Sequence, residues 1–172
     1  MRLAWFSPWP PQASGVAGIS AVVVNRLAAS GHAVDVFVDE RAVSTGRTAA
    51  DAPAPGQVRV QSAHDFVWRH ARGQFDLAVY QLGNSRLHEY IWPYLFQFPG
   101  LAVLHDARLH HARARALLAT RRPDDYRAEF AFNHPGAAPA AERFVPVVDG
   151  LYYYLWPMTR AVVASSRLTA AH

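Results

Sequence analysis

The sequence contains neither cysteine nor lysine. The absence of cysteine excludes disulfides, thiolate metal ligands and a cysteine nucleophile, and it favours a reducing, cytoplasmic setting. Without lysine there is no Walker phosphate loop, which needs a Gly-Lys-Ser/Thr step. All 17 basic residues are therefore arginines, and with 13 acidic residues the formal net charge is +4. The arginines are scattered apart from a cluster at Arg113, Arg115, Arg121 and Arg122, which has no aromatic stacking platform, so we expect no nucleic-acid partner.

Long hydrophobic runs are also missing. The first apolar run, residues 3–6, ends at a Pro-rich loop and is too short for the core of a signal peptide. Residues 145–156 are apolar but shorter than a membrane span, and we interpret them as a buried or surface-lying helix. The aromatic run 152–156 within them could meet a partner domain or a membrane face. Peripheral contact with the inner face of a membrane is thus an expectation beside the cytoplasmic one.

The chain has 172 residues, of which 51% are hydrophobic and 17% charged, values typical of one globular domain. Apolar runs alternate with segments of helical spacing. We expect an α/β fold, a Rossmann-like doubly wound, mostly parallel sheet with helices on both faces. The expected strands are residues 3–6, 32–38, 58–61, 75–80, 101–104 and 161–164. The expected helices are 16–30, 63–72, a segment capped by Ser85, a segment carrying His110, and 140–156, with 123–139 irregular.

Polar and glycine residues gather at the predicted carboxyl ends of these strands, where ligands bind in such sheets. The glycines at 15 and 18 precede a helix whose N-terminus favours a phosphate, although a tight turn that only glycine permits explains them equally well. The spacing is not that of a dinucleotide fingerprint. The candidate substrate-binding residues at this edge are Ser14, Gly15, Val16, Gly18, Gly83, Asn84, His110, His111 and Ser165.

His105 and Asp106 follow the strand at 101–104 and are the candidate catalytic pair. An imidazole beside a carboxylate suits holding sugar hydroxyls or moving a proton. The alternative is that Asp106 caps the next helix while His105 satisfies a buried backbone group. Because His111 points about a quarter turn from His110, and no second group of ligands is present, we expect no metal.

Aromatic residues recur at every second position from Tyr90 to Phe98, inside a segment predicted to be helical. No single helical face explains this spacing, so we expect most of them to pack in the core and some to be exposed. The exposed ones could contribute to an interdomain or acceptor-facing surface.

Several segments resemble, in order, the N-terminal domain of the family 4 glycosyltransferases, in a bacterial subgroup. They are FSPWPPQASGVA (6–17), LAASGHAVDV (27–36), FDLAVYQLGNS (75–85) with His88, PGLAVLHD (99–106) and LHH (109–111). The resemblance implies that residues 1–172 form the single acceptor-side half of a retaining enzyme with two facing Rossmann-like domains. It further implies hexose transfer from a nucleoside diphosphate sugar as co-substrate, without another cofactor.

The same resemblance implies two kinds of partner, a C-terminal domain that holds the nucleotide sugar and a sugar or lipid-linked acceptor. Gly15 would lie near the donor pyrophosphate, and His105 would contact the transferred sugar or the acceptor. Gly18 departs from the subgroup, which often carries an acidic residue there. Two alternatives remain: a non-catalytic flavodoxin-like binding module, and a basic adaptor for polyanions.

Overall fold

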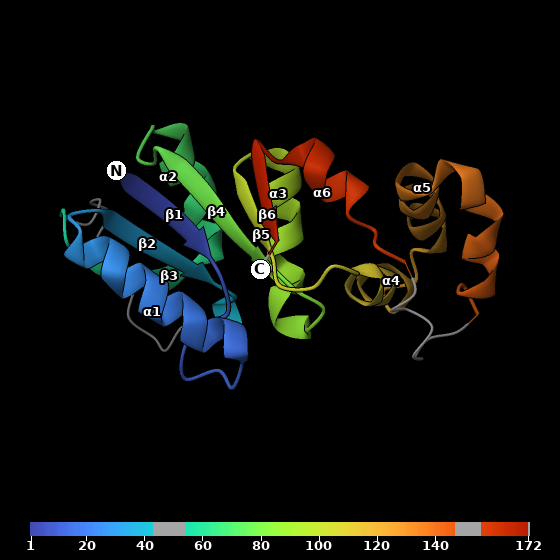
Figure 1. The fold of residues 1–172 in the computed structure, drawn as a ribbon, viewed down its shortest axis with the longest axis horizontal. Coiled ribbons are helices and arrows are strands. Elements are labelled where there is room, and N and C mark those ends of the chain that lie inside the picture. The colour runs from blue at the N-terminus through green and yellow to red at the C-terminus, as the bar shows by residue number, and fades with distance from the viewer. Residues whose placement is uncertain (43–53, 147–155, 172) are drawn as a thin grey trace.

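The computed structural model describes residues 1–42, 54–146 and 156–171, and its centre is a six-stranded parallel sheet (Figure 1). The strand order is β3-β2-β1-β4-β5-β6, the order of a doubly wound Rossmann-like sheet. The fold class expected from the sequence is therefore confirmed. The strands are β1 Arg2–Phe6, β2 Ala33–Val38, β3 Val58–Ser62, β4 Leu77–Leu82, β5 Leu101–Leu104 and β6 Leu168–Ala171.

Hydrophobic side chains alternate between the two faces of the sheet, and each face builds its own core. On one face, Leu3 and Trp5 join the valines of β2 beneath Val24 of helix α1 (Gly15–Ala29). On the other face, Phe6 and Phe37 stack 5.2 Å apart and pack against helices α2 (Phe66–Ala71) and α3 (Trp92–Gln97). Helices thus cover both faces, which holds the carboxyl ends of the strands in fixed positions.

Short 3-10 helices connect several of these elements. They are η1 (Glu40–Ala42), η2 (Ala63–Asp65), which leads into α2, and η3 (Arg86–Ile91), which leads into α3. Ser85 caps η3, as expected, by accepting a hydrogen bond from the backbone N–H of Leu87. The change from a 3-10 to an α-helix after Ile91 explains the aromatic spacing. Trp92 is buried, Tyr90, Tyr94 and Phe98 pack against the core, and Phe96 is exposed.

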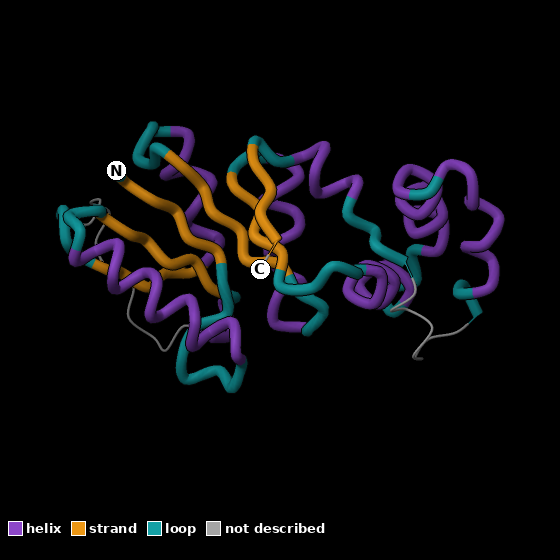
Figure 2. The backbone as a smooth tube through the Cα atoms, viewed as in Figure 1, coloured by secondary structure: helices purple, strands orange, loops and turns teal. Residues whose placement is uncertain are grey.

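A group of helices is inserted between β5 and β6 at the end of the molecule far from β3 (Figure 2). It contains α4 (His110–Leu118), α5 (Pro123–Asn133) and η4 (Pro135–Arg143), and α6 (Arg160–Ser165) returns the chain to the sheet. Rings of His110, Tyr126, Phe130 and Phe144 form its interior, with centroids 4.7–6.1 Å apart. α4 also forms one wall of the candidate site.

Three sequence predictions fail in this region. Residues 123–139 are helical rather than irregular, because Pro123 stands in the first turn of α5 and Asp124 and Asp125 favour a helix N-terminus. Of the predicted helix 140–156, only residues 140–143 are helical among those described: they belong to the 3-10 helix η4, which ends at Arg143, and Trp156 is not helical. Residues 147–155, including most of the aromatic run at 152–156, lie outside the described residues.

The third failure concerns the last strand. The apolar run 161–164, predicted as a strand, lies in helix α6, and the last strand is β6, which follows it. Short apolar runs do not distinguish a strand from a buried helix, and here one face of α6 packs through Val162. Arg167 donates its backbone N–H to Gly100, just before β5, so Ser165 lies at the amino edge of the parallel sheet.

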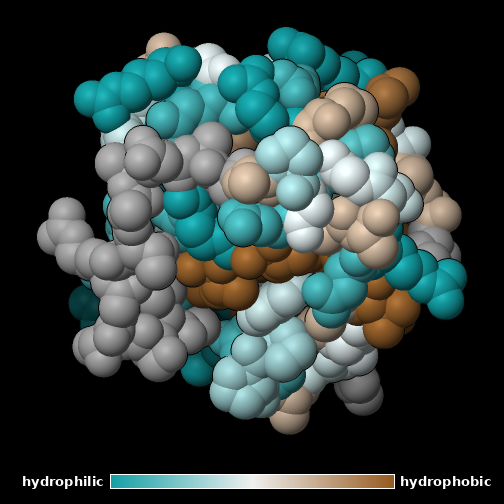
Figure 3. Space-filling view, turned by 90° about the vertical axis from the view of Figure 1, so that its left-hand side faces the viewer, coloured by the Kyte–Doolittle hydropathy of each residue, from teal (hydrophilic) through white to brown (hydrophobic). Residues whose placement is uncertain are grey.

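The end of the molecule that carries β3 shows a short band of hydrophobic atoms framed by hydrophilic ones (Figure 3). Val60 in this edge strand is 38% exposed. Within residues 1–42, 54–146 and 156–171, no helix has the length and hydrophobicity needed to cross a bilayer.

One buried ionic cluster links β2, β3 and α2. The Asp35 carboxylate, 1% exposed, accepts hydrogen bonds from Arg59 at 2.8 Å, Gln61 at 2.8 Å and Arg69 at 2.9 Å. Buried charges are tolerated only when they are paired and hydrogen-bonded, so this cluster ties the two strands to the helix.

Candidate functional site

The site lies where the direction of winding changes, between β1 and β4. Ala4 pairs with Ala78 and Phe6 with Tyr80 in parallel register, so both strands end at the same edge. The connection after β1 goes to one side of the sheet and that after β4 to the other, which leaves a crevice outside the strand ends. This crevice is the usual ligand position in doubly wound sheets.

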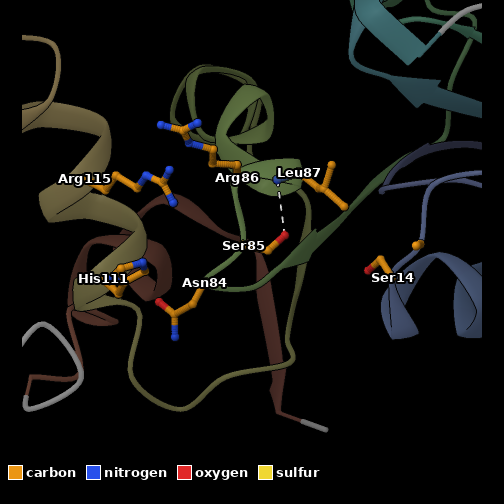
Figure 4. Close-up of a pocket in the computed structure, with 8 residues that line it drawn as sticks. Ser14, Asn84, Ser85, Arg86, Leu87, His111 and Arg115 are labelled. Atoms are coloured by element: carbon orange, nitrogen blue, oxygen red, sulfur yellow. Dashed lines mark hydrogen bonds between the residues drawn. The ribbon is translucent and has the colours of Figure 1, made fainter. Parts of the chain in front are cut away.

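A cavity of about 550 Å³ occupies this position (Figure 4). One wall comes from the loop before α1, a second from the turn after β4 and the start of η3, and a third from α4. In Figure 4, Ser14 lies across the cavity from Arg115 and His111 of α4, and Asn84 and Ser85 lie between the two sides. The lining residues are Ala13, Ser14, Asn84, Ser85, Arg86, Leu87, His111 and Arg115.

The N-terminus of α1 forms the first wall. Ser7 at the end of β1 fixes the loop, because its hydroxyl lies 2.7 Å from that of Ser20 in the helix and both are buried. Ser14 is the N-cap residue, yet its side chain makes no capping hydrogen bond. The first backbone N–H groups of a helix have no intrahelical acceptor, so those of α1 can receive an anion here.

Gly15 and Gly18 are not required by the backbone. A Cβ added at either position meets no atom within 4 Å, and neither residue has a positive φ. The tight-turn explanation of these glycines therefore fails. Gly15, Val16 and Gly18 all lie in the first turn or two of α1, with Gly15 and Gly18 exposed.

Asn84 forms the second wall and connects three segments. Its backbone N–H donates to Asp106 at 2.8 Å, its side-chain amide donates to the carbonyl of Arg108 at 2.6 Å, and its Oδ1 accepts from the N–H of Ala112 at 3.2 Å. Asn84 thereby caps α4 from another part of the chain. The predicted substrate-binding residues Gly83 and Asn84 therefore also have a structural role at the rim.

His105 and Asp106 stand at the end of β5, beside the end of β4. Nε2 of His105 lies 2.7 Å from Oε1 of Gln81, and since an amide oxygen only accepts, Nε2 carries the proton. His105 therefore hydrogen-bonds a side chain and not a backbone group. Asp106 accepts a hydrogen bond from the backbone N–H of Asn84 and does not cap α4, whose N-cap is Leu109. The pair borders the crevice but does not line the 550 Å³ cavity.

Buried His88 completes this polar cluster. It was not predicted as a site residue and was noted only as part of a segment that resembles the family 4 glycosyltransferases. Its Nδ1 donates to the carbonyl of Gln81 at 2.8 Å. Burial lowers the pKa of His88, and the neighbouring His105 adds to the lowering, against the opposing effects of the Gln81 hydrogen bond and Asp106. A Cβ at position 83 would lie 3.0 Å from His88 Nε2 and 3.2 Å from Asp106 Oδ2. Glycine therefore lets the His88 and Asp106 side chains lie this close to the turn.

The two adjacent histidines of α4, His110 and His111, lie in different environments. His110 is fully buried, and its Nε2 lies 2.8 Å from the hydroxyl of Tyr126. His111 lines the cavity. The prediction of His110 as a rim residue is therefore wrong in position, because the first turn of α4 directs it into the helical insertion.

Ser85, Arg86 and Arg115 line the cavity but are not among the site residues predicted from the sequence. Arg115 stands four residues after His111, a spacing that places both on one face of α4, and Arg86 follows the turn after β4 directly. Those two spacings were the available signals. Ser165, in contrast, lies at the opposite edge of the sheet from the cavity.

Among the described residues, no group of three or more histidine, aspartate or glutamate side chains is arranged to hold a metal ion. Comparison of the chain with protein-family models, with curated proteins and with solved structures finds no match. The fold and the site define the class, a Rossmann-like α/β domain with a cavity at its switch point.

Proposed function

We propose that the chain is the acceptor-binding half of a glycosyltransferase that transfers a hexose from a nucleoside diphosphate sugar with retention of configuration. One observation carries the proposal: the N-terminus of α1, the turn at Asn84, and the His105–Asp106 step all lie at one edge, on the two sides of the switch point. A helix N-terminus suits a pyrophosphate, and an imidazole beside a carboxylate suits sugar hydroxyls.

Each group has a role in this reaction. The free N–H groups of α1 meet the negative charge that develops on the leaving diphosphate, so no metal ion is needed at this wall. His105, held by Gln81 at the end of β5, positions hydroxyl groups of the transferred sugar or the acceptor. Asp106, held by Asn84, keeps the ends of β4 and β5 together. A C-terminal domain facing this edge would supply the nucleotide-binding groups.

The absence of a steric reason for Gly15 supports this assignment. No close contact and no positive φ in the described backbone calls for glycine at this position. Close approach of a ligand to the helix N-terminus is the physical benefit that remains.

The test is a titration of ¹⁵N-labelled chain with glucose, mannose and their methyl glycosides, read by amide NMR. We expect shifts concentrated at Gly83, Asn84 and residues 105–106, and we expect His105→Ala to remove them without unfolding the chain. His64→Ala, an exposed histidine on η2, is the matched control. Saccharide shifts elsewhere on the surface, or hexose transfer by this chain alone, would contradict the proposed division of labour.

A second candidate is a non-catalytic ligand-binding module of flavodoxin-like type. It is favoured by one observation, that His105 and Asp106 both have hydrogen-bond partners within the fold and so already perform structural tasks. In that case the same titration gives binding in the cavity that His105→Ala leaves unchanged.

A further inference from the structure

We propose that the ligand of this cavity carries a phosphate monoester, and that Arg86 and Arg115 hold it. The inference rests on the proposed function in one respect only, the assignment of the phosphate to an acceptor molecule. It adds a charge requirement that the proposed function does not contain.

The first observation is the charge of the cavity wall. Among its eight lining residues are two arginines and one histidine, and there is no carboxylate. The guanidinium groups of Arg86 and Arg115 approach from opposite sides, one from η3 and one from α4 (Figure 4). A concave wall with charge of one sign concentrates the field and attracts an anion of the opposite sign.

The second observation is what these two arginines lack. Neither takes part in an ion pair or a side-chain hydrogen bond within the described part of the chain. Their neighbours in the same helical region do: Arg113 binds Glu129 through two contacts of 2.6 Å, Arg122 binds Asp125, and Arg127 binds Glu142. The acidic side chains of α5 and η4 are thus paired with other arginines, and Arg86 and Arg115 are left to a ligand.

The third observation is the match between this wall and one ligand chemistry. A phosphate monoester carries a charge of about −1.5 to −2 near neutral pH and presents three acceptor oxygens. Two guanidinium forks supply the opposite charge and the directed N–H donors. A single carboxylate would leave one arginine without a counter-charge, and a neutral sugar would leave both.

The N-terminus of α1, at the far wall near Ser14, gives the cavity a second anion-binding end. Under the proposed function that end faces the diphosphate of the donor. The arginine pair then belongs to the other substrate, so the acceptor is a phosphorylated compound, either a soluble sugar phosphate or the phosphate headgroup of a lipid.

The test measures binding of glucose 6-phosphate, glucose and inorganic phosphate to the chain by calorimetry. We expect glucose 6-phosphate to bind more tightly than glucose, and Arg86→Ala with Arg115→Ala to weaken its binding by about ten- to hundredfold. Arg26→Ala with Arg143→Ala removes the same charge from exposed arginines outside the cavity and should leave the affinity unchanged. Equal binding of glucose and glucose 6-phosphate, or full affinity in the Arg86/Arg115 variant, overturns the proposal.

Two further comparisons distinguish a lipid headgroup from a soluble sugar phosphate, and the phosphate site from the proposed function. Arginine-dependent binding to vesicles of phosphatidic acid in phosphatidylcholine, exceeding that of glucose 6-phosphate, identifies a lipid headgroup, and the reverse order identifies a soluble sugar phosphate. If inorganic phosphate binds through the arginines as tightly as glucose 6-phosphate, the phosphate site stands and the sugar-binding function fails. If glucose binds as tightly as its phosphate, the function stands and the phosphate site fails.

Discussion

The backbone N–H of Asn84 donates a 2.8 Å hydrogen bond to the carboxylate of Asp106, and this contact joins the ends of β4 and β5. It holds the turn that carries the cavity wall against the step that carries the candidate catalytic pair. The relationship makes Asp106 a positioning residue for Asn84, whatever else it contacts.

We therefore expect Asp106→Ala to destabilise the fold by about 1–3 kcal/mol, because a partly buried N–H loses its acceptor. Asp106→Asn retains an oxygen acceptor and should lose less. Urea unfolding followed by circular dichroism measures both. Glu40→Ala, whose side chain is 75% exposed, is the control and should hardly move the midpoint. A midpoint for Asp106→Ala equal to that of the control would show that the contact does not hold the turn.

Gly15 provides a prediction in which stability and binding change in opposite directions. Gly15→Ala meets no steric obstacle, so it should leave the chain as stable as before or more stable by up to about 1 kcal/mol. The added methyl group should nevertheless weaken binding of pyrophosphate at the N-terminus of α1. Thermal unfolding and calorimetry measure the two effects. Asn25→Ala, on an exposed position of the same helix, should change helix stability only; unchanged pyrophosphate binding in Gly15→Ala would assign these glycines no ligand role.

The adjacent histidines of α4 make a matched pair. His110→Ala removes a buried ring from the aromatic interior and a hydrogen bond to Tyr126, and we expect a loss of about 2–4 kcal/mol. His111→Ala removes a side chain that lines the cavity and should mainly weaken ligand binding. Urea unfolding and glucose 6-phosphate calorimetry on both variants separate the roles. The reverse pattern would place the wrong histidine in the site.

The sheet was largely predictable from sequence because its first five strands, β1 to β5, are short apolar runs with clear turn signals between them. β1 through β5 and α1 all lie within a few residues of their expected bounds. The edge strand β6 was not predictable, since all four of its residues are exposed and its sequence, Leu-Thr-Ala-Ala, carries no strand pattern. Its place in the sheet depends on pairing with β5, a contact distant in sequence.

The candidate site was predicted only in part, and for a related reason. Residues directly after strands, such as Asn84 and His105, could be placed at the rim because parallel strands share an edge. The spacing from His111 indicates a shared helix face for Arg115, but the place of that face depends on how α4 is held against the turn after β4 by the cap from Asn84. His110 and Ser165 failed because a helix-face assignment and a strand assignment were each ambiguous in short segments.

The buried cluster at Asp35 predicts a large loss of stability. Asp35→Ala leaves Arg69, 1% exposed, without its carboxylate partner, and we expect a cost of about 3–5 kcal/mol by urea unfolding. Adding Arg69→Met should recover part of the loss, because the uncompensated buried charge is then removed. Asp76→Ala breaks an ion pair between more exposed side chains and should have a far smaller effect. No recovery in the double variant would mean that Asp35 acts through packing rather than charge.

The last prediction concerns pH and depends on His88. Burial holds the pKa of His88 below its ordinary value of 6.5, so the folded chain resists a proton that the unfolded chain accepts. Stability therefore falls as pH drops through about 6.5, by at most about 1.4 kcal/mol per pH unit for this group. The pKa values of His70 and His134 are lowered mainly by burial as well, and they act in the same direction.

Urea unfolding at several pH values between 7.5 and 5.5 measures this dependence. His88→Gln should flatten the curve, because the amide does not titrate, while it can still donate to the carbonyl of Gln81. His64→Gln, at a histidine whose side chain is 70% exposed, should leave the slope as it is. A slope that is the same in the native chain and in His88→Gln would assign the acid sensitivity to other groups. Since His88 contacts the turn at Gly83, loss of its neutral form should also loosen the cavity wall, and ligand binding should weaken over the same pH range.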